Sequence, residues 1–569
     1  MISRKGDVLL GQMLIDKGII TPQQLDEGLK EQKKTGDFIG ATLIRLGFAK
    51  EDDIFPVLSE KLNIPYIKLK DAEVSRDIIK KVPAKFASYY RLMPVKQEKN
   101  VLTVAVTDPL DLHTLDDIRL LLDCDINAVL ASEPDIIENI KKYYGIGADT
   151  VDKIMEDAAK ESSVISKSGE SVEEMADDAS IIKFVNEILQ QAVVDRATDV
   201  HIEPFEDELR IRYRIDGVLH NVSIPPTIKY LHSAIISRIK IMASLNIAEK
   251  RLPQDGRIKI KVNDKNIDLR VSIIPTVYGE NVSIRLLTAD LLLSLESLGL
   301  VKTNLEIIAQ MIKKPHGIIF VTGPTGSGKT TTLYACLNKI NSSRLNIITI
   351  EDPIEYELKG ITQVQIHPKI GLTFAEGLRH MLRHDPDIMM VGEVRDFETA
   401  EIAIRIALTG HLVFSTLHTN DASGAVARLL DMGIEPYLVS SSVECAIAQR
   451  LVRLICSKCK KEIKLDDKLK KELGLKIDYS KTKIYQGEGC PACKFTGFKG
   501  RTGIYEILPL TDEIRDLVLR RASADQIKQK AVALGMKTLF DDGVEKILAG
   551  VTTIGEVLRV TKVEAALEE

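Results

Sequence analysis

The sequence predicts a multidomain α/β protein, and three observations lead to this fold class. The chain has 569 residues, and at roughly 100–200 residues per domain this length suggests three to five domains. Strand-length apolar segments alternate with helical patterns over about residues 300–455, which predicts a parallel sheet covered on both faces. Two earlier segments, 101–109 and 209–217, alternate like half-buried strands and end in turn signals.

The first domain is predicted to cover residues 1–145, with a helical half followed by a small α/β half. Apolar residues recur at helical spacing over residues 1–65, and Thr21–Pro22 marks a helix start because threonine can cap and proline suits the first turn. Residues 9–20 and 38–49 echo one another, each with a glycine, a Leu-Ile pair and a second glycine. This echo suggests a duplicated helical unit.

The remaining boundaries follow from shifts in composition. Residues 146–178 are rich in Gly, Ser, Asp and Glu with few large apolar residues, which predicts a flexible linker. A helical pattern and alternating strands over 179–290 predict a second α/β domain. A short linker at 291–303 leads to the parallel-sheet domain at 304–455, and the tail at 498–569 is predicted to be helical.

The bulk composition gives no sign of nucleic-acid binding or of a membrane span. The net charge is −5, so there is no overall basic excess. No apolar stretch approaches the ~20 residues of a membrane helix. The N-terminus has a basic start but neither a long apolar region nor a small-residue cleavage site. We therefore expect a cytoplasmic protein whose membrane association comes through a partner.

A complete phosphate-binding pattern, GxxxxGK[ST], stands near the front of the third domain. An apolar strand pattern at 317–322 precedes it and a helical pattern follows, which is the context this motif requires. The glycines let backbone N–H groups turn toward phosphate oxygens, Lys329 adds charge at the outer phosphates, and the Thr330 hydroxyl reaches Mg²⁺. ATP and Mg²⁺ are the expected ligands. The predicted binding residues are Gly323, Pro324, Thr325, Gly326, Ser327, Gly328, Lys329, Thr330 and Thr331.

Carboxylates follow two apolar strand patterns, as hydrolysis would need. Glu393 follows the strand at 388–391 and is a candidate for directing the metal or water; a surface glutamate at a strand end is the alternative. Glu351, Asp352 and Glu355 follow another strand, and the carboxyl ends of parallel strands are where ligands bind in open α/β sheets. A solvated acidic turn is the alternative for this second cluster.

Two histidines flank one further strand pattern. His411 opens this strand and His418 follows it, one strand beyond Glu393. His418 is a candidate to hydrogen-bond a phosphate or to sense its loss. Because a lone histidine is often structural, a functional and a structural role both stay open for His411 and His418.

Four of the seven cysteines form two CxxC pairs within the segment 456–497. Each CxxC turn can present two thiolates to one tetrahedral ion, and all-sulfur ligation favours Zn²⁺. Four protein ligands leave no open position, so the expected role is structural; reduced thiols without metal are the alternative. The predicted ligands are Cys456, Cys459, Cys490 and Cys493.

The order and spacing of these motifs resemble the secretion ATPase superfamily. GPTGSGKT, TIEDPIEY, MMVGEVRD and STLHTND follow one another as in that family, and their flanks are similar to the type II secretion ATPase (general secretory pathway protein E) and to the pilus assembly ATPase. The resemblance is strong over about 180–560 and looser over 1–145. It implies a RecA-like P-loop ATPase core. The catalytic residues it implies are Glu393 (Walker B), Glu351, Asp352 and Glu355 (Asp box, around Mg²⁺ and water), and His411 and His418 (His box).

The second domain resembles the PAS-like N2 domain of the same family, in ATDVHIEP, RIRYRIDGVLH and EKRLPQDGRI. Arginines of that domain reach toward the nucleotide across a subunit boundary or within the closed subunit. The resemblance implies nucleotide contacts for Arg270 and Arg285, with Arg257 behind them, because a mobile arginine at the γ-phosphate makes hydrolysis depend on domain closure. Without the resemblance, Arg270 is a solvent-facing residue of a half-buried strand.

The N-terminal helical segments resemble the paired motifs that bind cyclic di-GMP in some relatives. Those motifs usually begin with Arg-Leu-Gly, and Leu9 stands at the arginine position here, which removes a guanine or phosphate contact. Two interpretations stay open. The block is either a regulatory cyclic di-GMP domain or a helical adaptor that docks on a partner protein.

At the level of function, the resemblance implies a homohexameric ATPase that powers type IV pilus assembly or type II protein secretion. Its implied partners are an inner-membrane platform protein and a partner on the cytoplasmic side. A pilus retraction motor, a nucleic-acid-linked translocation ATPase and a non-hydrolysing nucleotide switch are the alternatives. No nucleic acid is expected as a partner, because no run of basic and aromatic residues stands out.

Overall fold

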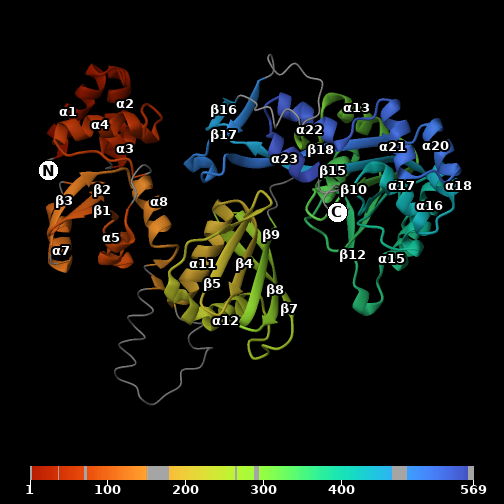
Figure 1. Cartoon of the computed structure of the whole chain (residues 1–569), viewed down its shortest axis with the longest axis horizontal. Helices are drawn as coiled ribbons and strands as arrows, with labels where there is room; N and C mark the ends of the chain where they lie inside the picture. Colours follow the sequence, from red (N-terminus) through yellow and green to blue (C-terminus); the bar gives the residue numbers. More distant parts are fainter. Residues whose placement is uncertain are drawn as a thin grey trace. The chain divides into compact units, whose positions relative to one another are not determined.

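The computed structural model describes residues 3–35, 38–69, 74–109, 111–122, 124–148, 150–151, 179–262, 265–287, 294–463 and 483–561 (Figure 1). Most of the predicted 146–178 linker, the first residues of the predicted 291–303 linker and the middle of the cysteine segment lie outside these ranges. The chain divides into two compact units, Met1–Leu286 and Leu287–Glu569, which are described separately. No helix in the described ranges combines the length and the apolarity needed to cross a membrane.

The N-terminal block is helical, as predicted. Its helices are α1 (Ser3–Asp16), α2 (Pro22–Thr35), α3 (Ile39–Arg45) and α4 (Glu51–Leu62). The sequence echo is also a structural one. After α1, the backbone N–H of Ile19 donates to Leu14 O at 2.9 Å, and after α3, Phe48 donates to Leu43 O at 3.0 Å. The two repeats therefore leave their first helix through the same turn.

The second part of the N-terminal region is a three-stranded sheet with helices around it. The strands run in the order β1-β2-β3, with β1 antiparallel and β3 parallel to β2. The strand predicted at 101–109 and the predicted small α/β half are confirmed. The elements are α5 (Arg76–Lys81), α6 (Ala84–Tyr89), β1 (Leu92–Glu98), β2 (Val101–Val106), α7 (Leu112–Leu122), β3 (Asp125–Leu130) and α8 (Glu133–Tyr143).

The next region is a six-stranded sheet in the order β6-β5-β4-β9-β8-β7. One face packs on α11 and α12, because alternate strand residues such as Ile202, Ile211 and Ile284 share a core with Ile188 and Ile235. The opposite face carries the charged residues of the same strands. The elements are α11 (Ala179–Val194), β4 (Ala197–Pro204), β5 (Leu209–Ile215), β6 (Val218–Asn221), η2 (Pro226–Leu231), α12 (His232–Met242), β7 (Gln254–Val262), β8 (Lys265–Thr276) and β9 (Gly279–Leu287).

The second unit is built on a seven-stranded sheet in the order β12-β11-β13-β14-β10-β15-β18. The first six strands are parallel, and β18 is antiparallel to β15. The elements up to β15 are η3 (Leu295–Leu298), α13 (Lys302–Met311), β10 (Gly317–Thr322), α14 (Lys329–Ile340), β11 (Ile347–Glu351), β12 (Thr362–Gln365), η4 (Pro368–Ile370), α15 (Phe374–Met381), η5 (Leu382–His384), β13 (Ile388–Val391), α16 (Phe397–Leu408), β14 (Leu412–Leu417), α17 (Ala422–Asp431), α18 (Pro436–Ser442) and β15 (Val443–Ile455).

Both faces of this sheet are covered, which explains why its strands are apolar throughout. On β10, Ile318 and Phe320 lie in one core with Val413 and Ala403, whereas Ile319 and Val321 lie in a second core. This second core also holds the apolar face of α14. A parallel sheet between two helical layers is confirmed as predicted.

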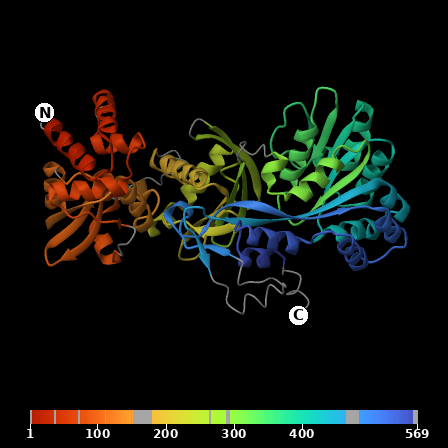
Figure 2. The ribbon, with the colours of Figure 1, turned by 90° about the horizontal axis from the view of Figure 1, so that it is seen from above.

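The C-terminal segment contains the predicted helices, but a strand precedes them. It begins with β18 (Phe498–Pro509), which pairs with β15 from Cys445↔Pro509 to Ile455↔Phe498 and so completes the main sheet (Figure 2). The prediction of helices is confirmed from Asp512 onward and is wrong for 498–509, because the pairing of β18 with β15 cannot be seen in the local sequence pattern. The other elements are β16 (Lys460–Ile463), β17 (Ile484–Gly487), η6 (Pro491–Cys493), α20 (Asp512–Leu519), α21 (Ala524–Ala533), α22 (Leu539–Leu548) and α23 (Ile554–Thr561).

Candidate active site

The loop between β10 and α14 has the backbone that phosphate binding requires. Gly323, Gly326 and Gly328 have φ values of 148°, 78° and 88°. A Cβ at Gly323 would lie 2.5 Å from the carbonyl oxygen of Gln449, and a Cβ at Gly328 would lie 2.8 Å from that residue's Nε2. The glycines are therefore needed both for the turn and for the close approach of β15.

Gln449, on β15, fixes the position of this loop. Its side chain is 2% exposed, and its Oε1 accepts a hydrogen bond of 2.7 Å from the Thr332 hydroxyl on the first turn of α14. Ser327 Oγ is buried and has no hydrogen-bond partner among the described residues. Since buried polar atoms are nearly always paired, this hydroxyl fits a loop whose missing partner is a ligand.

Lys329 lies folded onto its own loop. Its Nζ donates to Gly323 O at 2.8 Å and to Pro324 O at 3.1 Å. Burial and the nearby charge of Arg450 lower the pKa of Lys329, while Glu393 opposes them, and the result is a pKa of about 8. The ammonium group is thus short of compensating negative charge, which a phosphate would supply.

Glu393 lies just after β13, which pairs with β14; β14 separates β13 from β10 in the sheet. Its carboxylate is 13% exposed and lies 2.8 Å from the guanidinium of Arg395 and 3.2 Å from Nε2 of His418. Arg395 also lies within electrostatic range of Asp352, at the end of β11. Carboxylates from two strand ends therefore share one cation at the carboxyl edge of the sheet.

His418 is held in this place by the end of β14. Thr322 Oγ1 accepts a hydrogen bond of 2.8 Å from Thr419 N and donates to Leu417 O at 3.0 Å. Thr322 is the last residue of β10, directly before the phosphate-binding loop. The threonine therefore fixes the position of His418 relative to that loop from one side.

The structure separates the remaining predicted residues into two groups. Asp352 is exposed and Glu355 half-buried in the loop after β11, whereas the Glu351 side chain is buried and turned into the protein. His411 lies at the other end of β14 from His418, and its Nδ1 is 3.1 Å from Ile406 O. A six-residue strand is roughly 20 Å long, so His411 is not part of this site within one chain. The family resemblance implied a catalytic role for both His411 and His418, and the length of β14 keeps them apart within one chain; the role of His411 stays a prediction.

The predicted arginines belong to the first unit and lie on the charged face of its six-stranded sheet. Arg285 Nε donates to Asp199 at 3.1 Å, across the β4–β9 pair. Arg257 and Arg270 stand directly opposite one another on β7 and β8.

Sequence inspection missed three residues around the loop. Arg450 lies on β15 close enough to lower the pKa of Lys329, and Arg395 and Gln449 make the contacts described above. Arg450 and Gln449 lie in an apolar strand pattern, which gave no reason to assign them a role. Only the strand order, with β15 beside β10, brings them to the phosphate-binding loop.

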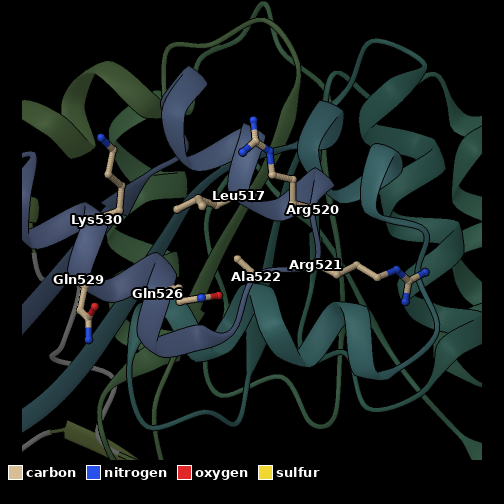
Figure 3. Close-up of a pocket in the computed structure, with 7 residues that line it drawn as sticks. All are labelled: Leu517, Arg520, Arg521, Ala522, Gln526, Gln529 and Lys530. Atoms are coloured by element: carbon tan, nitrogen blue, oxygen red, sulfur yellow. The ribbon is translucent and has the colours of Figure 1, made fainter.

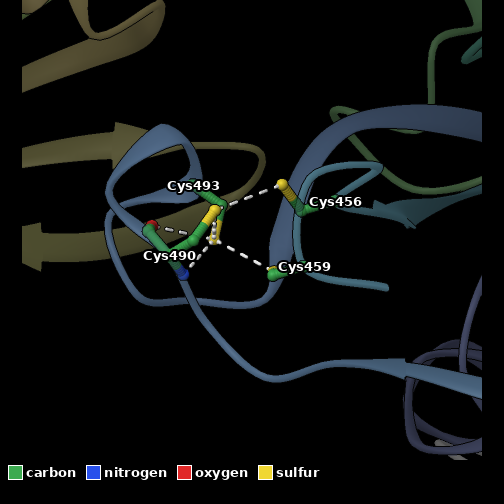
Figure 4. A group of neighbouring side chains, drawn as sticks. All are labelled: Cys456, Cys459, Cys490 and Cys493. Atoms are coloured by element: carbon green, nitrogen blue, oxygen red, sulfur yellow. Dashed lines mark hydrogen bonds between the residues drawn. The ribbon is translucent and has the colours of Figure 1, made fainter. Parts of the chain in front are cut away.

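The four paired cysteines converge on one point (Figure 4). All four sulfurs lie within 4.8 Å of one another, and Sγ–Sγ distances are 3.8 Å for Cys456–Cys490, 3.8 Å for Cys459–Cys493 and 3.7 Å for Cys490–Cys493. A tetrahedron with Zn–S bonds of about 2.3 Å has edges of about 3.8 Å. The donor set and its spacing therefore fit a structural Zn²⁺.

A depression of about 590 Å³ lies between α20 and α21. Its charged side chains, Arg520, Arg521 and Lys530, diverge from one another (Figure 3). Arg521 also lies 3.5 Å from Glu435. Ligand sites place polar groups convergently, so the nucleotide chemistry belongs to the loop at Lys329 and not to this depression.

Family comparison agrees with the site. Residues 174–559 match the family of type II/IV secretion system proteins, and residues 62–150 match the MshEN domain. The solved structure of the ATPase DotB from Legionella pneumophila has the same fold, with a TM-score of 0.50 at 22% identity over 68% of this chain and 95% of DotB.

Two curated relatives extend over almost the whole chain. The type IV pilus assembly ATPase PilB of Myxococcus xanthus is 46% identical over 96% of this chain and 98% of its own length. The type II secretion system protein E of Xanthomonas campestris is 41% identical over 99% of this chain and 100% of its own length. With a complete phosphate-binding loop beside Glu393 and His418, this chain belongs to the type II/IV secretion system family and is one of its ATP-hydrolysing motor proteins.

Proposed function

We propose that this chain assembles into a cytoplasmic homohexamer that hydrolyses ATP to power type IV pilus assembly or type II protein secretion. The observation that carries the proposal is the meeting of Lys329, Glu393 and His418 at one edge of the sheet. Full-length relatives named for each of the two machines support this pair of functions equally. The proposed partners are a platform protein of the inner membrane and a partner on its cytoplasmic side.

Binding of ATP would rearrange the free loop. Lys329 leaves the carbonyl oxygens of Gly323 and Pro324 for the outer phosphates, and the Ser327 hydroxyl gains a partner. Mg²⁺ would be held by Thr330, Asp352 and Glu355, and it would neutralise charge on the phosphates. These assignments rest on the place of Thr330 in the first turn of α14 and on that of Asp352 and Glu355 in the loop after β11.

Glu393 is proposed as the residue that orients and polarises the attacking water. In the free protein its carboxylate is shared between Arg395 and His418 at 2.8 and 3.2 Å. A carboxylate in an ion pair is a weaker hydrogen-bond acceptor for water. Release from Arg395 is therefore a required step, and the incoming phosphates offer Arg395 another anion.

Ring assembly is proposed because the arginines to which the family resemblance assigns nucleotide contacts belong to the first unit, whereas the phosphate-binding loop belongs to the second. Arg270 and Arg285, with Arg257 opposite Arg270, would bring positive charge to the γ-phosphate from the same or a neighbouring chain. The three arginines stand on the charged face of the six-stranded sheet, with Arg257 and Arg270 in register. Light scattering that finds a fully active monomer in ATP would contradict the ring.

The cysteine cluster is proposed to hold Zn²⁺ and to fix the fold around the end of β15. Cys493 Sγ already accepts hydrogen bonds from Cys490 N at 3.1 Å and from Gly497 N at 3.3 Å. These bonds orient the sulfur as a ligand would need. Native protein without stoichiometric zinc by elemental analysis would overturn this assignment.

Two roles are proposed for the N-terminal region, and they have different tests. The MshEN match over 62–150 and the repeated turns after α1 and α3 favour cyclic di-GMP binding, whereas Leu9 in place of arginine favours a protein-docking adaptor. The Leu9 side chain lies outside what the structure describes. Calorimetric heat with cyclic di-GMP supports the first role; no heat at high micromolar ligand supports the second.

The motor function is tested by allele replacement in the organism that carries this gene. Lys329→Ala should abolish ATP hydrolysis in the purified protein and, in cells, either surface pili or secreted protein. Loss of pili assigns the pilus machine, and loss of secretion assigns the secretion machine. Wild-type levels of both with a hydrolysis-dead protein would refute the motor role. Stimulation of ATPase activity by DNA would point instead to a translocation function.

A further inference from the structure

Glu351 ends β11, but its side chain is turned into the protein. It is 2% exposed, and neutral donors engage both carboxylate oxygens. Oε1 accepts hydrogen bonds from the Thr349 hydroxyl at 2.6 Å and from Gln363 Nε2 at 3.1 Å. Oε2 accepts one from the Tyr334 hydroxyl. A carboxylate enclosed in this way has little capacity left for a metal ion or an attacking water.

Tyr334 connects this buried carboxylate with the loop that follows it. The side chain is 1% exposed and stands on α14, five residues after Lys329, which is roughly 7.5 Å along the helix axis. Its hydroxyl oxygen accepts hydrogen bonds from the backbone N–H of Glu355 at 3.4 Å and from Gln363 Nε2 at 3.3 Å. One hydroxyl therefore joins the P-loop helix, β11, β12 and the acidic loop.

Further contacts fix the acidic loop that follows β11. Gln363 Nε2 donates to Tyr356 O at 3.2 Å, and Gln363 Oε1 accepts from Leu358 N at 2.7 Å. The rings of Tyr334 and Tyr356 pack edge to face with centroids 4.7 Å apart. The loop over residues 352–358 is thus fixed on α14 and β12 by side chains, and Tyr334 is the one that stands on the same helix as Lys329.

We propose that Tyr334 is a positioning residue for ATP hydrolysis, whose hydroxyl, anchored on buried Glu351, sets the place of Glu355 relative to the P-loop. Glu351 then acts through Tyr334, unlike exposed Asp352. This inference rests on the proposed role of Glu355 in holding Mg²⁺. Because a displacement of about 1 Å can cost about 100-fold in rate, the loss of one hydroxyl should be visible in turnover.

The direct test is steady-state ATP hydrolysis by full-length Tyr334→Phe. We expect kcat to fall about 10- to 100-fold while KM for ATP changes less than about twofold, since Lys329 and the loop backbone are intact. Amide hydrogen exchange at Glu355 should speed up, because its acceptor is lost. Wild-type kcat, or a loss expressed only in KM, would overturn the proposal.

Tyr213→Phe is the matched control. Tyr213 is 2% exposed, and its hydroxyl donates to Ile188 O at 2.7 Å in the first unit. The substitution removes one buried hydrogen bond without touching the acidic loop, so kcat and KM should stay at wild-type values. An equal loss of kcat in Tyr213→Phe would show that Tyr334→Phe acts only through stability, and would overturn the inference.

A double-mutant cycle with Glu351→Gln separates positioning from direct catalysis. If both residues form one link, the two single variants and the double variant share a similar kcat. If Glu351 acts on the nucleotide, Glu351→Gln lowers kcat again in the Tyr334→Phe background, which refutes the proposal. Glu355→Gln tests the premise. An active Glu355→Gln protein refutes the role of Glu355, whereas inactive Glu355→Gln with active Tyr334→Phe refutes the positioning alone.

Discussion

The titration of Lys329 makes ATP binding depend on pH in a direction the structure determines. In the free loop its pKa is about 8, because burial and Arg450 disfavour the ammonium ion more than Glu393 favours it. A bound triphosphate places negative charge beside the nitrogen and keeps the proton on it. Binding above this pKa therefore takes up a proton, and the affinity for ATP should fall as pH rises.

The size of the effect follows from the fraction of Lys329 that is charged. With a pKa of about 8, this fraction falls from roughly 0.9 near pH 7 to roughly 0.1 near pH 9. Only the charged form is ready to bind, so the apparent Kd for ATP should rise about tenfold over this range. The stability of the nucleotide-free protein should rise with pH, whereas its affinity for ATP falls. The unfolded chain holds the Lys329 proton up to about pH 10.5, so the free protein gains stability between the two pKa values.

The assay is fluorescence titration with an ATP analogue in magnesium buffers between about pH 7 and pH 9.5, with near-ultraviolet circular dichroism as a check of folding. Two variants should shift the pH at which the Kd for ATP begins to rise, and they should shift it in opposite directions. Arg450→Gln removes a repelling charge and moves it to higher pH, whereas Glu393→Gln removes an attracting charge and moves it to lower pH. A Kd that does not change over this range, or a shift of the same sign in both variants, would refute the reasoning.

Three further predictions concern Glu393, the cysteine cluster and Glu556. Glu393→Gln should lower kcat by at least about 100-fold with ATP affinity kept near neutral pH, as single-turnover and binding assays would show; comparable turnover would remove Glu393 from catalysis. Cys490→Ser or a strong chelator should release zinc and lower Tm by several degrees, because the metal stabilises the folded state. An unchanged Tm with full metal loss would contradict a structural site. Glu556 is 3% exposed, and although burial raises its pKa, hydrogen bonds from Arg453 and Arg559 outweigh this and leave the pKa at about 2. The ionised Glu556 side chain should contribute about 3 kcal/mol to the free energy of unfolding. This contribution should be complete above about pH 4.5 and be lost as pH falls toward 2. Glu556→Gln should remove it in denaturant titrations, and a variant as stable as wild type would contradict this.

The parallel-sheet domain was predictable because its signals are local. A strand buried on both faces must be apolar throughout, and the phosphate-binding loop needs glycine where its backbone adopts a positive φ. Both features can be recognised in a short stretch of sequence. The cysteine cluster was predictable for a similar reason. Two CxxC turns restrict the ligand geometry even though 464–482, between them, lie outside the described residues.

What the sequence could not show depends on strand order and side-chain direction. The family resemblance assigns His411 and His418 to one motif, yet they stand at opposite ends of β14. Glu351 and Asp352 are neighbours in the chain, but successive residues of a strand end point in opposite directions, so one is buried against Tyr334 and the other is exposed. The seventh strand, β18, joins the sheet across a long separation in sequence that no local pattern could reveal.

The central claim is that Lys329 binds the outer phosphates while Glu393, freed from Arg395, addresses the terminal one. The most direct measurement is a crystal structure of the protein with Mg²⁺ and a non-hydrolysable ATP analogue. The account predicts Lys329 Nζ on phosphate oxygens in place of Gly323 O and Pro324 O, and the Glu393 carboxylate within one water or metal ion of the terminal phosphate. A bound nucleotide with Glu393 still paired to Arg395 and remote from that phosphate would contradict it.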